Sequence, residues 1–138
     1  MSHMESIAKA FFEACETGKG WSTCQAFCTP GATFSCQADA LAEVRTLQAY
    51  TDWMKGLFTP IPNGAYTLTA WGVDNERHAV VAAAVFTGSQ TGEGGPVPPT
   101  GMHIEADYAY VMQFEGDKIR HMKKIWNANF SLKQLGWA

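Results

Sequence analysis

At 138 residues the chain is long enough for one domain with a buried core, and we expect that domain over residues 4–138, with Met1 to His3 an expression scar. The net charge of −3 and the pI near 5.7 argue against a nucleic-acid partner, which favours a basic surface. No signal peptide and no apolar run long enough to cross a bilayer is visible, so we expect a cytoplasmic protein without membrane contact.

Apolar residues that recur every three or four positions predict two amphipathic helices. The first runs from Met4 to Thr17 and stops at a Gly-Lys-Gly segment, and the second runs from Thr46 to Phe58 and stops at a Pro-Ile-Pro-Asn-Gly turn. The other elements expected before the last hairpin are a short helix over Ser22 to Phe27, a short strand over Ala32 to Ala38, strands over Tyr66 to Val73 and His78 to Gly88, and a glycine- and proline-rich loop over Ser89 to Gly101.

All four cysteines, Cys15, Cys24, Cys28 and Cys36, lie in the segment that holds the first helix and the short strand. The Cys-x-x-x-Cys spacing has no second cysteine or histidine pair near it, so we expect no metal ion, and a reducing compartment keeps thiols free. We therefore expect free cysteines that pack as small apolar groups, with room for one thiol to reach a pocket.

The last long segment predicts a two-strand hairpin that fixes which side chains share a face. Runs of strand-forming residues, Met102 to Phe114 and Ile119 to Phe130, flank a Glu-Gly-Asp-Lys turn. Regular pairing outward from that turn, with a period of two, predicts one face made of Ala106, Tyr108, Tyr110, Met112 and Phe114 from the first strand and Ile119, His121, Lys123, Ile125 and Asn127 from the second.

A face that is mostly apolar and aromatic, with a few polar groups among the rings, is typical of a small-molecule pocket. We expect Trp53 and Met54 to close that pocket from the second amphipathic helix. The opposite face mixes charges with Val111, Met122 and Trp126, which favours a homodimer through the outer face of the sheet.

Helices followed by four long strands predict an α+β fold with one curved antiparallel sheet. Thr87 to Gly92, Pro98 to Gly101, Phe114 to Ile119 and Gln134 to Gly136 carry a resemblance to the SnoaL-like polyketide cyclases, of the nuclear transport factor two-like superfamily. The resemblance implies that the sheet curls into a cone closed by N-terminal helices, with the pocket inside the cone. The resemblance says less about the reaction than about the fold, because one fold serves many activities.

Relatives of that family often carry an acid where this chain has Asn127, whose amide cannot titrate. His121 is then the best candidate for the base, Lys123 for stabilising an enolate or phenolate, and Tyr108 for donating to a substrate carbonyl. We expect ligand contacts from Asn127, Tyr108, Tyr110, Met112, Trp53 and Met54. A bulge in either strand would swap the faces and make Asp107 the base, and Asp39 is a second reserve acid at the pocket mouth.

Two hypotheses follow. The first is a small cyclase, isomerase or lyase that acts by proton transfer on an apolar, carbonyl-bearing substrate without a cofactor. The alternative is a non-catalytic pocket for a hydrophobic small molecule, or a dimeric accessory protein. The missing acid at Asn127 favours the second hypothesis, and the polar set of His121, Lys123 and Tyr110 favours the first.

Overall fold

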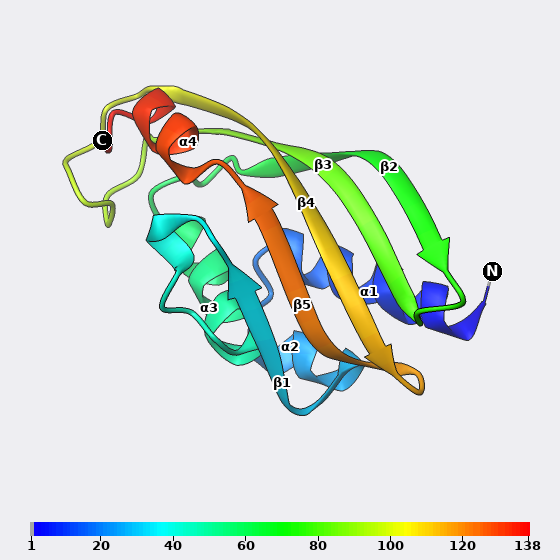
Figure 1. The fold of residues 1–138 in the computed structure, drawn as a ribbon. Helices are drawn as coiled ribbons and strands as arrows, with labels where there is room; N and C mark the ends of the chain where they lie inside the picture. The colour runs from blue at the N-terminus through cyan, green and yellow to red at the C-terminus, as the bar shows by residue number, and fades with distance from the viewer. Residues whose placement is uncertain (1) are drawn as a thin grey trace.

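The computed structural model describes residues 2–138, in which a curved sheet bends around two helices (Figure 1). Side-chain caps define where both helices begin, because Ser2 accepts from the backbone N–H of Glu5 and Thr46 accepts from that of Ala49, each at 3.1 Å. In chain order the elements are α1 (His3–Glu16), α2 (Trp21–Cys24), η1 (Gln25–Phe27), β1 (Cys28–Cys36), η2 (Asp39–Leu41), α3 (Leu47–Leu57), β2 (Ala65–Asp74), β3 (Ala79–Ser89), β4 (His103–Glu115), β5 (Lys118–Trp126) and α4 (Ala128–Gln134).

The five strands form one sheet in the order β1-β5-β4-β3-β2. This confirms the α+β fold with N-terminal helices, and it makes the sheet mixed rather than wholly antiparallel, since β1 pairs with β5 in parallel. A parallel pair needs a long connection, and α3 together with β2, β3 and β4 provides it. The short strand β1 thereby becomes the edge of the sheet beside β5.

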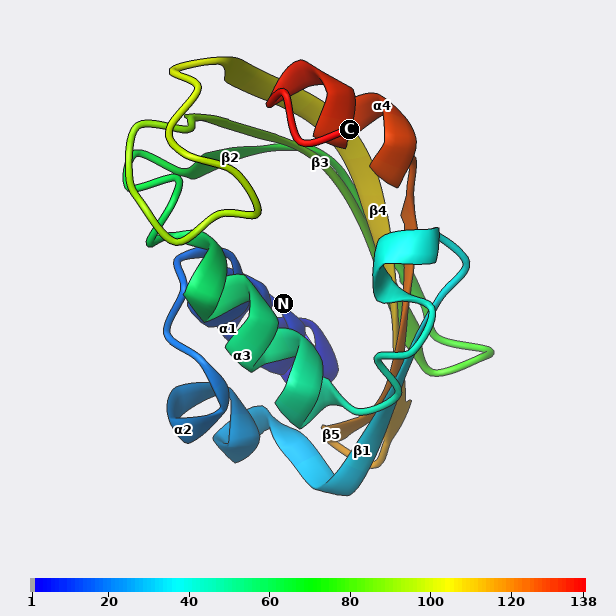
Figure 2. The ribbon, with the colours of Figure 1, turned by 90° about the vertical axis from the view of Figure 1, so that its left-hand side faces the viewer.

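Helices α1 and α3 lie inside the curve of the sheet, as the end-on view shows (Figure 2). From β4 the side chains of Tyr108, Tyr110 and Met112 enter this concave side and are at most 7% exposed, as the sequence predicts. Phe12 of α1 packs edge to face on Tyr110, with ring centroids 5.5 Å apart. Burying each such large side chain stabilises the fold by about 1.5–3 kcal/mol.

The β4–β5 hairpin contains a bulge that the regular pairing did not predict. Glu115 pairs with Lys118 and Phe114 with Ile119, but the next pair joins Gln113 to His121, so one extra residue, Arg120, lies between them. From that point the side chains of β5 alternate in the opposite phase. Met122, Lys124 and Trp126 therefore point to the concave side, and the expectation that His121 and Lys123 lie in the interior is wrong.

The end of β5 also differs from the expectation, because the strand stops at Trp126 and a helix follows. The side chain of Asn127 accepts from the backbone N–H of Phe130 at 3.1 Å and so caps α4. Trp126 Nε1 donates to Ser131 Oγ at 2.8 Å, which ties the helix back to the strand. Asn127 is exposed, so its predicted place at the closed end of the cone is wrong.

All four cysteines are free and buried, as expected from their spacing. Over residues 2–138, no helix combines the length and the apolar character that a membrane span requires.

Candidate active site

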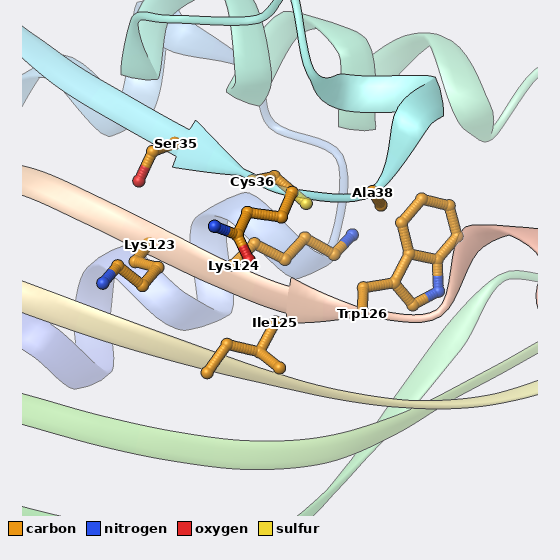
Figure 3. A pocket seen from close by; sticks show the side chains of 8 residues that line it. Ser35, Cys36, Ala38, Lys123, Lys124, Ile125 and Trp126 are labelled. Carbon is orange, nitrogen blue, oxygen red and sulfur yellow. The ribbon is translucent and has the colours of Figure 1, made fainter.

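A pocket of about 540 Å³ opens at the edge of the sheet where β1 and β5 separate. Cys36 and Lys124 form the last pair between these strands, and beyond it β1 turns away toward η2, so the end of β5 keeps β4 on one side and has no strand on the other. The volume lies in the range of small-molecule sites. Figure 3 shows its lining, which comprises Ser35, Cys36, Gln37, Ala38, Lys123, Lys124, Ile125 and Trp126.

Lys124 is the buried charged group in the wall of this pocket, with its residue only 6% exposed. Its Nζ donates to the Tyr50 hydroxyl at 3.0 Å. Aromatic rings surround the ammonium group, with centroid distances to Nζ of 4.3 Å for Trp126, 5.1 Å for Tyr50 and 5.4 Å each for Trp53 and Tyr108. Ring faces attract a cation, and this offsets part of the cost of taking the ammonium out of water.

The Tyr50 hydroxyl begins a hydrogen-bonded chain that crosses the interior to Glu16. Tyr50 and Tyr110 share a short hydrogen bond between their hydroxyls, and Tyr110 donates to Glu16 Oε2 at 2.7 Å. Tyr108 donates to the other carboxylate oxygen, Oε1. Because Tyr110 uses its proton on Glu16, Tyr50 must donate to Tyr110. The donors therefore all point one way, from Lys124 through two hydroxyls to Glu16.

Glu16 is 1% exposed at the last turn of α1, and its burial shifts its titration. Burial raises the pKa of the Glu16 carboxyl, against the opposing effects of the Tyr108 hydrogen bond and the Lys124 charge. Burial also lowers the pKa of the Lys124 ammonium to about 8, with the Glu16 charge acting in the opposite direction. A proton that passes from the Lys124 ammonium to the Glu16 carboxylate leaves two uncharged groups. Both pKa shifts favour these neutral forms.

The three tyrosine hydroxyls stay protonated in this environment. Burial, and after it the negative charge of Glu16, raises the pKa of Tyr50, Tyr108 and Tyr110. Each hydroxyl can therefore accept one proton and give up another without becoming a stable phenolate near neutral pH. This is the arrangement that a proton relay requires.

Two predicted catalytic residues lie on the convex side of the sheet instead. His121 bonds through Nδ1 to Thr33 Oγ1 at 2.7 Å and through Nε2 to Ser35 Oγ at 3.1 Å. Burial lowers the pKa of His121, and the charges of Arg120 and Lys123 lower it further. Lys123 is exposed at the outer rim of the pocket, on the face of β5 opposite Lys124 (Figure 3).

The remaining predicted residues divide between the interior and the surface. Tyr108 joins the hydrogen-bonded chain, as does Tyr110, while Trp53 packs against the Lys124 ammonium. Residues Met54 and Met112 are buried in the core. Asp107 and Asn127 are exposed and line a shallow hollow between β4 and the end of β5. Asp39 is exposed on η2 and lines a neighbouring hollow.

Sequence reasoning missed Glu16, Tyr50 and Lys124 as site residues, and it allowed one thiol to reach the pocket without naming Cys36. For Glu16 a signal exists, because it follows Ala8 and Phe12 at steps of four and so falls on the buried stripe of α1. An acid on an apolar stripe needs a buried partner. Among residues 2–138, no group of three or more His, Cys, Asp or Glu side chains is arranged to hold a metal ion.

A curved sheet that encloses helices and a polar cluster inside an apolar interior defines a fold of the nuclear transport factor two-like type, shared with ketosteroid isomerase-like proteins. Residues 8–122 match the family model described as a SnoaL-like domain, and the chain belongs to that family. A search of curated protein sequences gave no significant match.

Solved structures of the same fold cover nearly the whole chain. One is a provisional SnoaL-like polyketide cyclase from Jannaschia sp. CCS1, with 17% identity, a TM-score of 0.79 and coverage of 99% of this chain and 93% of that one. Another is IdmH, a provisional polyketide cyclase from Streptomyces antibioticus, with 18% identity, a TM-score of 0.77 and coverage of 96% and 98%. A ketosteroid isomerase-like protein from Catenulispora acidiphila, in complex with trimethylamine, has 17% identity, a TM-score of 0.70 and coverage of 96% and 93%.

Proposed function

We propose that the protein is a cofactor-free enzyme, a cyclase, isomerase or lyase, that moves a proton on an apolar, carbonyl-bearing small molecule. The supporting fold neighbours are provisional polyketide cyclases and a provisional isomerase. The catalytic centre in this proposal is the inner wall of the pocket at Lys124, rather than His121 or Lys123 on the convex side.

The observation that carries the proposal is the unfilled hydrogen-bonding capacity of Lys124. An ammonium has three N–H donors. Within residues 2–138, the Tyr50 hydroxyl is the acceptor bonded to Nζ, and rings surround the rest of the group. A carbonyl oxygen entering the pocket would take a free N–H donor, and the ammonium formed when neutral Lys124 accepts the proton would stabilise the negative charge left on that oxygen.

The apolar part of the lining suits the rest of such a substrate. Trp126, Ile125, Ala38 and Cys36 offer rings and aliphatic groups at the mouth and wall of the pocket. In its neutral form Lys124 can accept a proton from the carbon next to the carbonyl. The chain through Tyr50 and Tyr110 then gives that proton a route to Glu16 and back.

Hydrogen–deuterium exchange tests proton transfer without knowledge of the natural substrate. Apolar cyclic and aryl ketones would be incubated with the protein in D₂O, and loss of the α-proton signal would be followed by NMR. We expect Lys124→Met to lower the exchange rate by about 10²–10⁴, the usual share of a general acid or base. The control is Lys133→Met, which removes an exposed amine on α4 outside the pocket lining and should leave the rate within about twofold of the parent.

The exchange rate should also depend on pH in a defined direction. A base acts in its deprotonated form, so the rate should rise with pH through the Lys124 pKa of about 8 and become constant above it. A rate that falls over this range, or that survives in Lys124→Met, contradicts the assignment of Lys124.

One observation favours the non-catalytic alternative, namely that both oxygens of Glu16 are already occupied by tyrosine donors. In a network whose hydrogen bonds are complete without a ligand, stabilising the fold is a sufficient role. If apolar ketones bind in the pocket by NMR and none of them exchanges protons, the protein is better described as a binder of hydrophobic small molecules.

We also propose a homodimer through the convex face of the sheet. The interface predicted around Val111, Met122 and Trp126 has to be revised, because Met122 is fully buried and Trp126 points to the concave side. The convex face instead exposes Val81 at 40% and Ile125 at 59%. A second copy of the chain would cover this apolar area. Sedimentation at micromolar concentration should show a dimer that Ile125→Asp weakens, and a monomeric parent chain would contradict the proposal.

A further inference from the structure

The position of Lys124 fits a second kind of chemistry, in which the amine itself becomes bonded to the ligand. A nucleophilic lysine needs a neutral amine, an opening to a ligand, and a group nearby that takes and returns a proton. The titratable groups around Lys124 come from every element packed against it: Glu16 and Cys15 from α1, Cys36 from β1, Tyr50 from α3, and Tyr108 and Tyr110 from β4.

We propose that the pocket captures an aldehyde or an unhindered ketone covalently, as an imine of Lys124. The inference uses the same pocket as the proposed function but does not need proton transfer at carbon. The ligand class is an apolar carbonyl compound, because the carbonyl must reach Nζ while the rest of the molecule lies against Trp126, Cys36 and Ala38.

Lys124, the two tyrosine hydroxyls and Glu16 supply and take back every proton that imine formation needs. The ammonium first passes one proton through Tyr50 and Tyr110 to Glu16, which leaves a neutral amine and a neutral carboxyl. The amine nitrogen bonds to the carbonyl carbon. One proton then moves from that nitrogen to the former carbonyl oxygen, which gives a carbinolamine. Glu16 then returns its proton along the same hydroxyls as the C–O bond breaks and water leaves. The products are one protonated imine, one water and the original carboxylate.

The surroundings of Lys124 favour this reaction over the same reaction at surface lysines. At about pH 7 an amine of pKa about 8 is neutral in about a tenth of the molecules, against roughly one in 2,500 at the ordinary lysine pKa. The aromatic cage excludes water from one side of the nitrogen, and the carboxylate of Glu16 supplies the counter-charge for the protonated imine.

Reductive trapping tests the proposal directly. The intact protein would be incubated with naphthaldehyde and cyanoborohydride at neutral pH, and the adduct located by intact mass and peptide mapping. Naphthaldehyde has no α-hydrogen, so it forms an imine but cannot undergo the proton exchange of the proposed function. We expect one dominant adduct on Lys124, labelled on the order of 10² faster than exposed lysines, the ratio of their neutral fractions.

Matched variants separate the site from general lysine reactivity. Lys133→Met, which removes an exposed amine outside the pocket lining, should keep the adduct, and Lys124→Met should lose it. Glu16→Gln keeps the size of the side chain but replaces one acceptor oxygen with an NH₂ group and cannot store the proton, so trapping should slow by about tenfold or more. The Cys36 thiol also lines the pocket, but its adduct with an aldehyde is a hemithioacetal, which cyanoborohydride does not fix.

Peptide mapping of the parent protein decides the question even if Lys124→Met does not fold. Label spread over surface lysines, with none enriched at Lys124, overturns the inference. If ketone exchange depends on Lys124 while naphthaldehyde leaves it unlabelled, the lysine acts as a base only, and the proposed function stands without the imine. If Lys124 is labelled and no ketone exchanges, covalent capture stands and the proposed function fails.

Discussion

Replacing Tyr110 with phenylalanine tests whether the interior hydrogen-bonded chain stabilises the protein. The Tyr110 ring is fully buried and its hydroxyl is the link between Tyr50 and Glu16. Tyr110→Phe keeps the ring and its packing on Phe12, so the loss comes almost entirely from the oxygen and its two hydrogen bonds. Glu16 then loses the donor from Tyr110 while it keeps the donor from Tyr108, and Tyr50 loses its acceptor.

The expected loss of stability follows from those two contacts. A hydrogen bond to a buried charged group contributes about 1.5–3 kcal/mol, and leaving the buried Tyr50 hydroxyl without its acceptor costs about 1 kcal/mol more. We therefore expect the free energy of unfolding of Tyr110→Phe to fall by about 3 kcal/mol at neutral pH. Urea denaturation followed by tryptophan fluorescence measures this change, with an unchanged slope showing that the folded state keeps its compactness.

A second tyrosine provides the control. The half-buried Tyr66 ring also packs on Phe12, and within residues 2–138 its hydroxyl makes no hydrogen bond to another protein group. Tyr66→Phe should change the free energy of unfolding by less than about 0.5 kcal/mol. If Tyr110→Phe is no more costly than Tyr66→Phe, the chain from Lys124 to Glu16 contributes nothing to stability and the reasoning about its geometry is refuted.

Two further predictions concern stability. Because the pKa of Lys124 is lower in the folded chain than in the unfolded chain, the folded state binds fewer protons between about pH 8 and the ordinary lysine pKa. The free energy of unfolding should therefore rise across that window by on the order of 2 kcal/mol in the parent relative to Lys124→Met, and parallel pH curves for the two would contradict this. Asn127→Ala should cost about 1 kcal/mol by urea denaturation because it removes the cap of α4, whereas Asn129→Ala, on the exposed side of that helix, should cost less than about 0.5 kcal/mol.

The order of elements was predictable because each depends on local signals. The apolar repeat and the Thr46 cap fix α3, and the alternation along β4 places Tyr108 and Tyr110 inside. The helix α4 was predictable in principle, since Asn127 is a strong capping residue, but Phe130 made the segment resemble a continuing strand. Where a local signal has two meanings, tertiary packing decides between them.

The site was less predictable because it depends on one extra residue in β5. The sequence Arg120-His121-Met122-Lys123-Lys124 has polar and apolar side chains in both phases, so neither register is excluded by its pattern. Glu16 and Lys124 come together only through the fold, because more than a hundred residues separate them in the chain. Reasoning from periodicity alone can find the apolar wall of such a site, but it cannot pair charges that meet across the interior.

The bulge at Arg120 also has a consequence for how the chain folds. The Glu-Gly-Asp-Lys turn closes equally well on a regular hairpin, in which Lys123 would stand opposite Tyr110 and Met122 would face water. Such a hairpin still offers an amine to the interior, so it is less stable than the native pairing chiefly because Met122 stays exposed, which costs about 1.5–3 kcal/mol. This difference in free energy arises only when the strands pack against α1 and α3. We therefore expect docking onto the helices to select the native register. Deleting Arg120 would make the regular hairpin and the native pairing the same structure, and the chain would then reach its final register without a competing one.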